Sequence, residues 1–334
     1  MEIKKILIIQ TAFIGDVILA TPLIEKLKRY YPDSELDFLV RKGNEGLLRD
    51  HPKINEVIIW DKRKAKYNGL AKLSRKVRRN KYDLLVNLQR FASSGIVTSS
   101  SRAKIRIGFS KNPFSFTLTH KFPHVIDQTT HEVERNLSLI KHLTDDSFQK
   151  PVLYPTDQDF KDVEKYKTHP YFCIAPASVW FTKEFPEEKW VELTDQLNQE
   201  RRVFLMGGPA DIELCQKIKN ESIHSNITVL AGELNFLQSA ALMKGARMNF
   251  VNDSAPLHMA SAVNAPVTAI YCSTIPEFGF GPLSDNSKIV QTREKLECRP
   301  CGLHGKKACP KKHFNCAYTI DVSRDILDAD HRNQ

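Results

Sequence analysis

The sequence predicts an α/β protein made of two doubly wound domains, each with a parallel sheet and helices on both faces. Short apolar, β-rich runs alternate with helix-periodic segments, which is the pattern of such sheets. The alternation stops at a polar stretch near the middle of the chain and then starts again. The length of 334 residues also fits two domains of ordinary size. Residues 1–155 are predicted to form the N-terminal domain and residues 156–334 the C-terminal domain, with the last helix able to pack back on the N-terminal one.

The N-terminal half contains five strand-like runs. Because helical segments separate them, we expect a parallel sheet. The strands are predicted at Ile6–Ile9, Leu36–Val40, Val57–Trp60, Leu84–Leu88 and Ile105–Phe109. Apolar residues recur at helical spacing in Asp16–Tyr30 and Glu132–Leu143, which are therefore predicted to be helices.

The C-terminal half repeats this order after a polar segment, Pro151–Pro170, that we interpret as the linker. Its strands are predicted at Tyr171–Ala175, Val203–Met206, Ile227–Leu230, Asn249–Val251 and Val267–Tyr271. Its helices are predicted at Trp190–Leu197, Ile212–Ile218, Phe236–Met243 and Ala255–Val263. Doubly wound sheets bind ligands beyond the carboxyl ends of their strands, and clefts between domains are common binding sites. Functional residues are therefore expected in the loops that follow strands.

The composition is that of a globular protein, with 41% hydrophobic and 26% charged residues. No run approaches the roughly 20 apolar residues that span a bilayer. The apolar run Ile6–Ile9 is too short for a signal-peptide core. These features predict a cytoplasmic protein.

The net charge of +10 is concentrated in one segment. Lys62–Lys81 holds ten Lys or Arg residues and no Asp or Glu. Leu70, Leu73 and Val77 within it have helical spacing, which predicts a basic amphipathic helix. Such a helix is either a solvated face or a surface that meets anionic lipid or a phosphorylated acceptor, and both interpretations stay open.

The loop after the first strand carries a single acidic residue. Only Gly15 is present where a dinucleotide-binding turn needs G-x-G-x-x-G, so a nicotinamide or flavin cofactor is not expected, and no other cofactor is predicted. Asp16 stands at this strand-to-helix turn. It can be an ordinary helix cap, or a general base that takes a proton from a hydroxyl nucleophile.

A second polar segment opens a helix in the C-terminal half. Asp253, Ser254 and Ala255 follow a strand, and His258 lies one turn later on the same helical face. Amide groups at a helix start bind anions, and small side chains let a phosphate approach them. The alternatives are simple capping for Asp253 and Ser254, and a core position for His258.

Three further residues complete the candidate site. Ser178 and Lys183 follow the first strand of the C-terminal half, and a lysine in such a loop can reach a diphosphate as a point charge. Glu213 follows the glycine turn at 207–209 and can accept hydrogen bonds from ribose hydroxyls. For each of them a solvated surface position is the ordinary alternative. The whole set suits transfer from a nucleotide-diphosphate donor to a hydroxyl acceptor.

In this order, these motifs resemble the ADP-heptose:lipopolysaccharide heptosyltransferase family, glycosyltransferase family 9, over nearly the whole chain. The resemblance rests on Gly15-Asp16 with Thr21-Pro22, His131–Arg135, Pro176-Ala177-Ser178, Lys183, Phe185-Pro186, Trp190, Gly207-Gly208-Pro209, Asp253–His258 and Cys298-Arg299-Pro300-Cys301. It implies a GT-B fold, with two Rossmann-like domains facing a cleft. It also implies inverting, metal-independent transfer of a heptose from ADP-heptose to the inner core of lipopolysaccharide.

The resemblance assigns roles to the candidate residues. Asp16 matches the catalytic base and Lys183 the lysine that neutralises the donor diphosphate. Ser254, Ala255 and His258 match the phosphate-binding helix start, and Glu213 is a looser match to the ribose-binding acid. The chain departs from the family in having Ala177, Phe185, Ala255 and Cys272 where the family usually has Gly, Trp, Gly and Gly. These changes leave open a transferase that uses another nucleotide sugar on a different glycolipid or glycan.

Four of the seven cysteines cluster near the C-terminus as Cys298, Cys301, Cys309 and Cys316. The first pair has the spacing of a zinc site and the second does not. Disulfides are unusual in the cytosol. We therefore favour reduced, packed thiols over a zinc site and predict no metal ligands. Cys173, Cys215 and Cys272 lie in apolar or helical runs and are expected to be buried.

The partners implied are a nucleotide-sugar donor and an anionic glycolipid acceptor, with peripheral contact at the inner face of the inner membrane through the basic surface. The alternative from another class is a nucleic-acid-binding protein that uses residues 62–81. That alternative leaves the two α/β domains and the 253–258 segment unexplained, so nucleic acid is not expected as a partner. A response to ADP would favour the transferase, and salt-sensitive oligonucleotide binding without it would favour the alternative.

Overall fold

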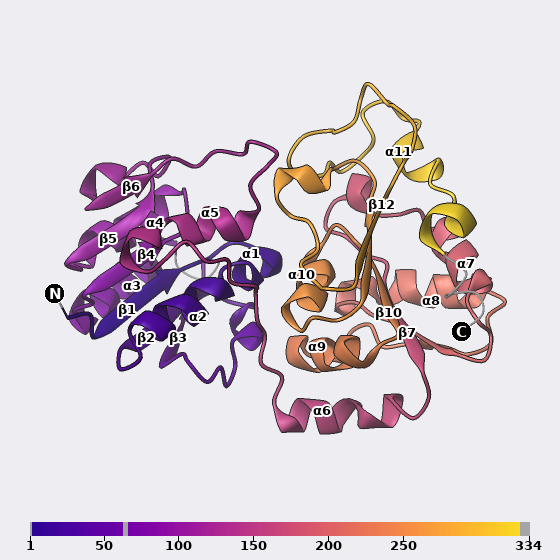
Figure 1. Cartoon of the computed structure of the whole chain (residues 1–334), viewed down its shortest axis with the longest axis horizontal. Helices are drawn as coiled ribbons and strands as arrows, with labels where there is room; N and C mark the ends of the chain where they lie inside the picture. Colours follow the sequence, from indigo (N-terminus) through magenta and orange to yellow (C-terminus); the bar gives the residue numbers. More distant parts are fainter. Residues whose placement is uncertain (1, 63–65, 328–334) are drawn as a thin grey trace. The chain divides into compact units, whose positions relative to one another are not determined.

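The computed structural model describes residues 2–62 and 66–327. It divides the chain into two compact units, Met1–Tyr154 and Pro155–Gln334 (Figure 1). Each unit has its own sheet and its own buried core, and each is described separately.

The first unit contains a six-stranded sheet with the order β3-β2-β1-β4-β5-β6, in which every neighbouring pair is parallel. Its strands are β1 (Lys5–Ile9), β2 (Glu35–Arg41), β3 (Glu56–Trp60), β4 (Leu84–Asn87), β5 (Ile105–Phe109) and β6 (His120–Phe122). The five predicted strands are confirmed. The edge strand β6 was not predicted because it has only three residues and no buried apolar run.

The helices of this unit alternate with the strands along the chain, and α3 packs on α4 while α2 packs on α5. They are α1 (Ile14–Ile18), α2 (Thr21–Tyr30), α3 (Lys66–Asn80), α4 (Ala92–Ser100) and α5 (Glu132–Ser138), with short 3₁₀ turns η1 (Glu45–Leu47), η2 (Ser115–Thr117) and η3 (Lys141–Leu143). The basic helix expected within 62–81 is therefore α3, although residues 63–65 of that segment lie outside the described residues. Leu73 and Val77 are buried against the sheet, as their spacing predicted.

The single helix predicted over Asp16–Tyr30 is wrong, because the chain breaks between α1 and α2. Pro22 has no N–H to donate to the Ile18 carbonyl. The Thr21 hydroxyl donates to that carbonyl instead, at 2.7 Å. The helix predicted over Glu132–Leu143 likewise ends early, at Ser138, and continues only as the turn η3.

The second unit repeats the topology of the first, with the parallel order β12-β11-β10-β7-β8-β9. Its strands are β7 (Tyr171–Ala175), β8 (Arg202–Leu205), β9 (Ile227–Val229), β10 (Met248–Asn252), β11 (Val267–Tyr271) and β12 (Ser287–Gln291). The five predicted strands are again confirmed, and β12 is an additional edge strand. Two parallel six-stranded sheets with helices confirm the predicted doubly wound α/β class.

Helices α9 and α10 cover one side of the second sheet, and α7 and α8 lie on the other (Figure 1). The helices are α6 (Asp157–Val163), α7 (Glu187–Gln196), α8 (Ile212–Glu221), α9 (Phe236–Gly245), α10 (Ala255–Ala262) and α11 (Asn315–Tyr318), with shorter turns η4 (Glu164–Tyr166), η5 (Phe181–Lys183), η6 (Pro209–Asp211), η7 (Pro276–Phe278) and η8 (Val322–Ile326). The last of these, η8, packs on α7 and β12 of its own unit. Residues 328–334 lie outside the described residues.

The segment Pro151–Pro170 is not simply a linker, because it contains α6 and η4. Thr156 and Asp159 form a reciprocal capping box at the start of α6, with the Thr156 hydroxyl accepting from the Asp159 amide at 3.2 Å. The helix then packs on α9. This helix was not predicted because its sequence is mostly polar, and only Asp159 and Val163 are buried. Across the described residues, no helix is long and apolar enough to cross a membrane.

The strand order places the functional loops. In each sheet the order reverses next to the first strand, between β1 and β4 in the first unit and between β7 and β10 in the second. Loops leaving the carboxyl ends of such paired strands diverge to opposite faces and leave a crevice for a ligand. Asp16 follows β1, Ser178 and Lys183 follow β7, and Asp253 follows β10.

Candidate functional site

Asn252, at the end of β10, joins the two loops that border the crevice of the second sheet. Its side chain is fully buried. The amide nitrogen donates to the Pro176 carbonyl at 2.7 Å, and the amide oxygen accepts from the Phe185 N–H at 3.0 Å. One buried amide therefore fixes both ends of the 176–185 loop to the strand that leads into Asp253.

The centre of this crevice is an ion pair. Lys183 Nζ lies 2.7 Å from Asp253 Oδ2, and both side chains are largely buried. The Thr274 hydroxyl, just beyond β11, donates to the same carboxylate oxygen at 2.6 Å. Loops after three different strands thus converge on one carboxylate, which holds the lysine ammonium at the mouth of the crevice.

Helix α10 begins directly beside this ion pair. Ser254 occupies the N-cap position, but its side chain makes no capping hydrogen bond. Its buried hydroxyl oxygen has no hydrogen-bond partner among the described residues. Asp253 is engaged with Lys183 and Thr274. Capping therefore does not explain either side chain, whereas an anion at the helix start would use the serine hydroxyl and the Ala255 amide.

His258 lies one turn into α10 and is buried, with 5% of its surface exposed. The ring centroid of Phe280 is 6.4 Å from that of the imidazole. His258 therefore sits on the inner side of the helix, on the face that begins with Ser254.

Fewer contacts hold the side chains of Ser178 and Glu213 in place than hold that of Lys183. The Ser178 N–H donates to Glu184 Oε2 at 3.0 Å, and its hydroxyl accepts weakly from the Trp180 N–H at 3.5 Å. Burial raises the pKa of the Glu184 carboxyl. Glu213 is exposed in the first turn of α8, which follows β8 at the same edge of the sheet.

The glycine turn before α8 is explained by packing. Gly207 and Gly208 have no left-handed backbone angle. A Cβ on Gly207 would lie 2.7 Å from Asp211 Cβ. The Gly208 N–H donates to Asp211 Oδ2 at 2.7 Å. Glycine is needed at position 207 because the Asp211 side chain closes over the turn, and not because the turn needs a special backbone conformation; a Cβ on Gly208 would meet Asp211 only at an ordinary 3.7 Å.

The segment 299–306, which we call the strap, packs on the outside of the loop that carries Lys183. The Thr182 N–H donates to the Lys306 carbonyl at 3.1 Å, and the Lys306 N–H donates back to the Thr182 hydroxyl at 2.8 Å. Gly305 fits so closely that an added Cβ would lie 2.7 Å from Lys183 Cγ and 2.5 Å from Trp180 Cβ. The strap therefore packs directly on the aliphatic stem of the lysine.

Arg299 anchors the same strap to the end of β11. Its guanidinium donates to the Cys272 and Thr274 carbonyls, both at 2.7 Å, and to the Gln291 side chain at 2.8 Å. The Cys301 N–H donates to the Ser273 carbonyl at 2.9 Å. The strap and the loop that carries Thr274 are therefore tied together.

The four C-terminal cysteines lie around one hollow with His313. Cys298 Sγ is 3.8 Å from His313 Nε2, and Cys301 Sγ is 3.3 Å from the Cys298 carbonyl oxygen. Within the described residues no group of three or more His, Cys, Asp or Glu side chains is arranged to hold a metal ion. The other thiols, Cys173, Cys215 and Cys272, are buried as expected, and burial raises the pKa of each.

Asp16 is the candidate residue in the first unit. It lies in the first turn of α1, half-buried, and its Oδ2 accepts from the Phe13 N–H at 3.1 Å. The buried pair Glu132–Arg135 closes at 2.8 Å at the start of α5. Burial raises the pKa of Glu132, and the negative charge of Asp16 raises it further. Asp16 is therefore both a helix-start acceptor and a carboxylate close to a second acid.

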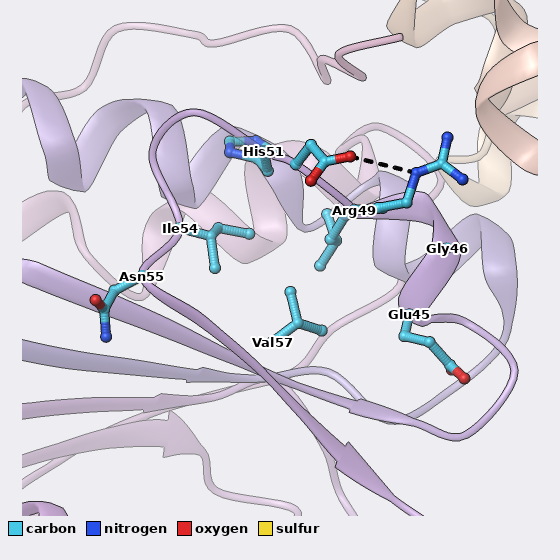
Figure 2. A pocket seen from close by; sticks show the side chains of 9 residues that line it. Glu45, Gly46, Arg49, His51, Ile54, Asn55 and Val57 are labelled. Carbon is cyan, nitrogen blue, oxygen red and sulfur yellow. Dashed lines mark ion pairs between the residues drawn. The ribbon is translucent and has the colours of Figure 1, made fainter. Parts of the chain in front are cut away.

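A hollow of about 460 Å³ lies elsewhere in the first unit, between η1 and β3. Figure 2 shows Ile54 and Val57 pointing into it and Arg49 at its rim. Arg49 Nε lies 3.5 Å from Asp50 Oδ2. None of the candidate residues lines it. It is mainly a feature of loop packing, with no cluster of groups suited to nucleotide chemistry.

The structure therefore brings together Lys183, Asp253, Ser254 and Ala255, and it adds three residues that the sequence analysis did not single out. Asn252, Thr274 and Gly305 position the lysine. For Thr274 a signal was available, since it is a polar residue just beyond a strand of the same sheet. Gly305 gave no signal, because its role depends on a strap that is distant in sequence.

Comparison with known proteins identifies the family to which the chain belongs. The model of glycosyltransferase family 9 (heptosyltransferase) matches residues 70–312. The chain is 30% identical over 290 residues to lipopolysaccharide heptosyltransferase 3 of Escherichia coli, an alignment that covers 82% of this chain and 85% of that protein.

Two solved structures share the fold. The family 9 glycosyltransferase of Veillonella parvula superposes with a TM-score of 0.79 at 23% identity, covering 87% of each chain. The ADP-heptose lipopolysaccharide heptosyltransferase II of Escherichia coli gives a TM-score of 0.76 at 22% identity, covering 89% of this chain and 95% of that chain. These matches confirm the GT-B class of the two sheets.

Proposed function

The chain belongs to glycosyltransferase family 9, the heptosyltransferases, and from this premise we propose that it transfers a heptose from ADP-heptose to a hydroxyl of the lipopolysaccharide inner core. The observation that carries the proposal is the Lys183–Asp253 pair beside the start of α10. A nucleoside diphosphate needs positive charge and free amides in that combination. The relatives support the sugar and the acceptor, because they are a lipopolysaccharide heptosyltransferase and an ADP-heptose lipopolysaccharide heptosyltransferase.

The donor diphosphate binds at the start of α10 in this proposal. An ammonium group has three donors, so Lys183 can keep one bond to Asp253 and direct the others to phosphate oxygens. The Ser254 hydroxyl and the Ala255 amide complete the contacts, with His258 on the same helical face. Ser178 lies in the loop that faces this helix start, and Glu213 on α8 accepts from the ribose hydroxyls.

Leaving-group stabilisation follows from this binding mode. As the bond to the sugar breaks, negative charge builds on the departing ADP. The oriented ammonium and the positive end of the helix dipole stabilise that charge without rearranging, which is an effective form of electrostatic catalysis. Lys183 and α10 thus supply the positive charge of a metal-independent reaction.

Asp16 is the proposed base. Its carboxylate takes the proton of the acceptor hydroxyl as the oxygen attacks the anomeric carbon on the face opposite to ADP, which inverts the configuration. The reaction requires the donor held by the second unit and the base of the first unit to meet in one complex.

The acceptor sets where the protein works. A lipopolysaccharide core is anchored in lipid, so we propose a cytoplasmic enzyme that contacts the inner face of the inner membrane peripherally. The exposed cations of α3 are suited to this contact because anionic lipids attract clustered Lys and Arg residues.

The test is incubation of the purified protein with a panel of nucleotide sugars and a core lipid that lacks the heptose. We expect release of ADP and a mass increase of one heptose only with ADP-heptose. Turnover of a different nucleotide sugar, with none of ADP-heptose, would assign the chain to another transfer reaction. Oligonucleotide binding without any response to ADP would reject the transferase altogether.

A further inference from the structure

The first unit carries a strongly basic hollow of about 590 Å³ at the edge of its sheet opposite to the loop of Asp16. We define the basic hollow by its six cationic side chains, Arg75, Arg78, Arg79, Lys81, Arg102 and Lys104. They come from the last turns of α3 and from the turns that enter β4 and β5. Arg102 and Lys104 lie outside the 62–81 segment, so only the fold reveals the cluster.

The positive charge of the basic hollow is not balanced within the protein. Asp83 neutralises Lys104 at 2.7 Å. The carboxyl-terminal ends of α3 and α4 each contribute roughly half a negative charge. The Asp37 carboxylate, which accepts from the Tyr82 hydroxyl at the floor, contributes one further negative charge. Against six cations this leaves a net charge of about +3. Cations crowded in this way repel one another unless an external anion binds between them.

Local backbone geometry supports a built site. Lys81 and Arg102 both have left-handed backbone angles, with φ of 52° and 58°. Glycine or asparagine adopts this conformation more easily than a long side chain does. The chain nevertheless places a cation at each of these turns, one before β4 and one before β5.

The polar groups at the floor of the basic hollow already have hydrogen-bond partners within the protein. The Tyr82 side chain is buried, and its hydroxyl donates to Asp37 and accepts from the Asn80 amide. The buried Ser101 hydroxyl donates to the Thr98 carbonyl at 2.6 Å. Cations are therefore the groups that the hollow offers to a ligand. With Tyr82 turned inward, no aromatic lining residue is available to stack on a nucleic-acid base.

We propose that the basic hollow docks on the phosphate groups of anionic phospholipids at a membrane surface. The exposed cations continue from the hollow along α3 to Lys72, whereas Lys76 is paired with Glu56, so more than one headgroup can bind side by side. This inference rests on the proposed function, because a lipid-anchored acceptor keeps the enzyme at such a surface. It adds to the cations of α3 three from neighbouring turns, Lys81, Arg102 and Lys104, and so makes the basic hollow the place of contact.

The test compares two variants that lose the same charge. Arg78→Glu with Arg102→Glu reverses two cations in the hollow. Lys161→Glu with Lys219→Glu reverses two exposed cations of the second unit and is the matched control. Each protein is sedimented with vesicles of phosphatidylglycerol and phosphatidylcholine, and with phosphatidylcholine alone, at two salt concentrations.

We expect the wild type and the control to bind the anionic vesicles in a salt-sensitive way, and the hollow variant to bind at least about ten-fold more weakly, since each cation near an anionic surface contributes severalfold. Equal binding by both variants would overturn the proposal. So would binding of inorganic phosphate or a single-stranded oligonucleotide through these arginines with no binding to vesicles.

Transfer to a water-soluble, lipid-free acceptor separates this proposal from the proposed function. The hollow variant should keep wild-type turnover in that assay, because neither arginine lies in the donor site. A wild type without transfer activity would reject the proposed function while leaving the vesicle result intact.

Discussion

Lys183 Nζ and Asp253 Oδ2 lie 2.7 Å apart, and the Thr274 hydroxyl holds the same carboxylate oxygen at 2.6 Å. The lysine is therefore oriented before any donor binds, with its stem packed against the strap at Gly305. A pre-oriented lysine loses less conformational entropy on binding than one that swings free in solvent. In the proposed donor site the ion pair therefore orients the lysine for the diphosphate, and this role can be tested.

Replacing Lys183 with alanine should weaken ADP binding by roughly ten- to hundred-fold, since a hydrogen bond to a charged group contributes about 1.5–3 kcal/mol. Isothermal titration calorimetry with ADP measures this directly. Lys189→Ala is the matched control, because it removes a lysine that pairs with Glu192 on the surface of α7 at 2.9 Å. Unchanged ADP affinity in Lys183→Ala would remove the lysine from the donor site.

Asp16→Asn should lower turnover by about a hundred-fold or more, which is the usual contribution of a general base. Asparagine can still accept the hydrogen bond from the Phe13 N–H, so the start of α1 should survive. ADP affinity should stay as in the wild type, because Asp16 belongs to the other unit. Turnover and calorimetry on the same preparation check both statements, and comparable turnover in the variant would exclude Asp16 as the base.

The sequence was sufficient for the strands and for the loops that follow them. Buried parallel strands are short continuous apolar runs, so ten of the twelve strands, including the edge strands β3 and β9, could be predicted directly. The other two edge strands, β6 and β12, could not, because they are largely exposed and lack such runs. The break at Pro22 was misread because the apolar spacing of Asp16–Tyr30 continues across it.

For a similar reason, only part of the candidate site could be predicted from the sequence. Lys183 and Asp253 each follow a strand, and a doubly wound sheet brings such positions together. Thr182 meets Lys306, and Lys183 meets Gly305, only because the strap returns to this edge after β12, and no local pattern predicts those contacts. The basic hollow escaped notice likewise, since Arg102 lies in a different turn from α3.

Gly305→Ala should weaken ADP binding through Lys183. The added methyl group would lie 2.5 Å from Trp180 Cβ, so the strap and the lysine loop must separate. Overpacking of this kind typically costs about 1–3 kcal/mol of stability. Gly281→Ala is the control, because its nearest neighbour would be Pro276 Cβ at 3.9 Å, an ordinary contact. ADP affinity and thermal unfolding of both variants provide the measurement.

A double-mutant cycle separates positioning from general damage. If Gly305 acts through the lysine, Gly305→Ala should have little further effect on ADP affinity once Lys183 is alanine. Full additivity of the two losses would mean that the strap affects the donor by another route.

His51 should make the protein less stable in acid. It is buried beside the hollow of Figure 2, where its Nδ1 accepts from the Lys53 N–H at 3.2 Å and its ring lies edge-on to Tyr154. Burial is the largest cause that lowers the pKa of its imidazole; the charge of Glu25 opposes it and that of Lys53 adds to it, which gives a pKa of about 4.

The direction of this change in stability with pH follows from proton uptake by the folded and unfolded states. Below about pH 6.5 the unfolded chain protonates this histidine while the folded protein does not, until the pH nears 4. Stability from His51 is therefore complete above 6.5 and falls as the pH drops, by up to about 3 kcal/mol. His51→Gln should flatten this part of the urea-unfolding profile between pH 6.5 and 4. The exposed His169→Gln should leave the slope as in the wild type. An unchanged slope in His51→Gln would show that this imidazole is protonated in the folded protein.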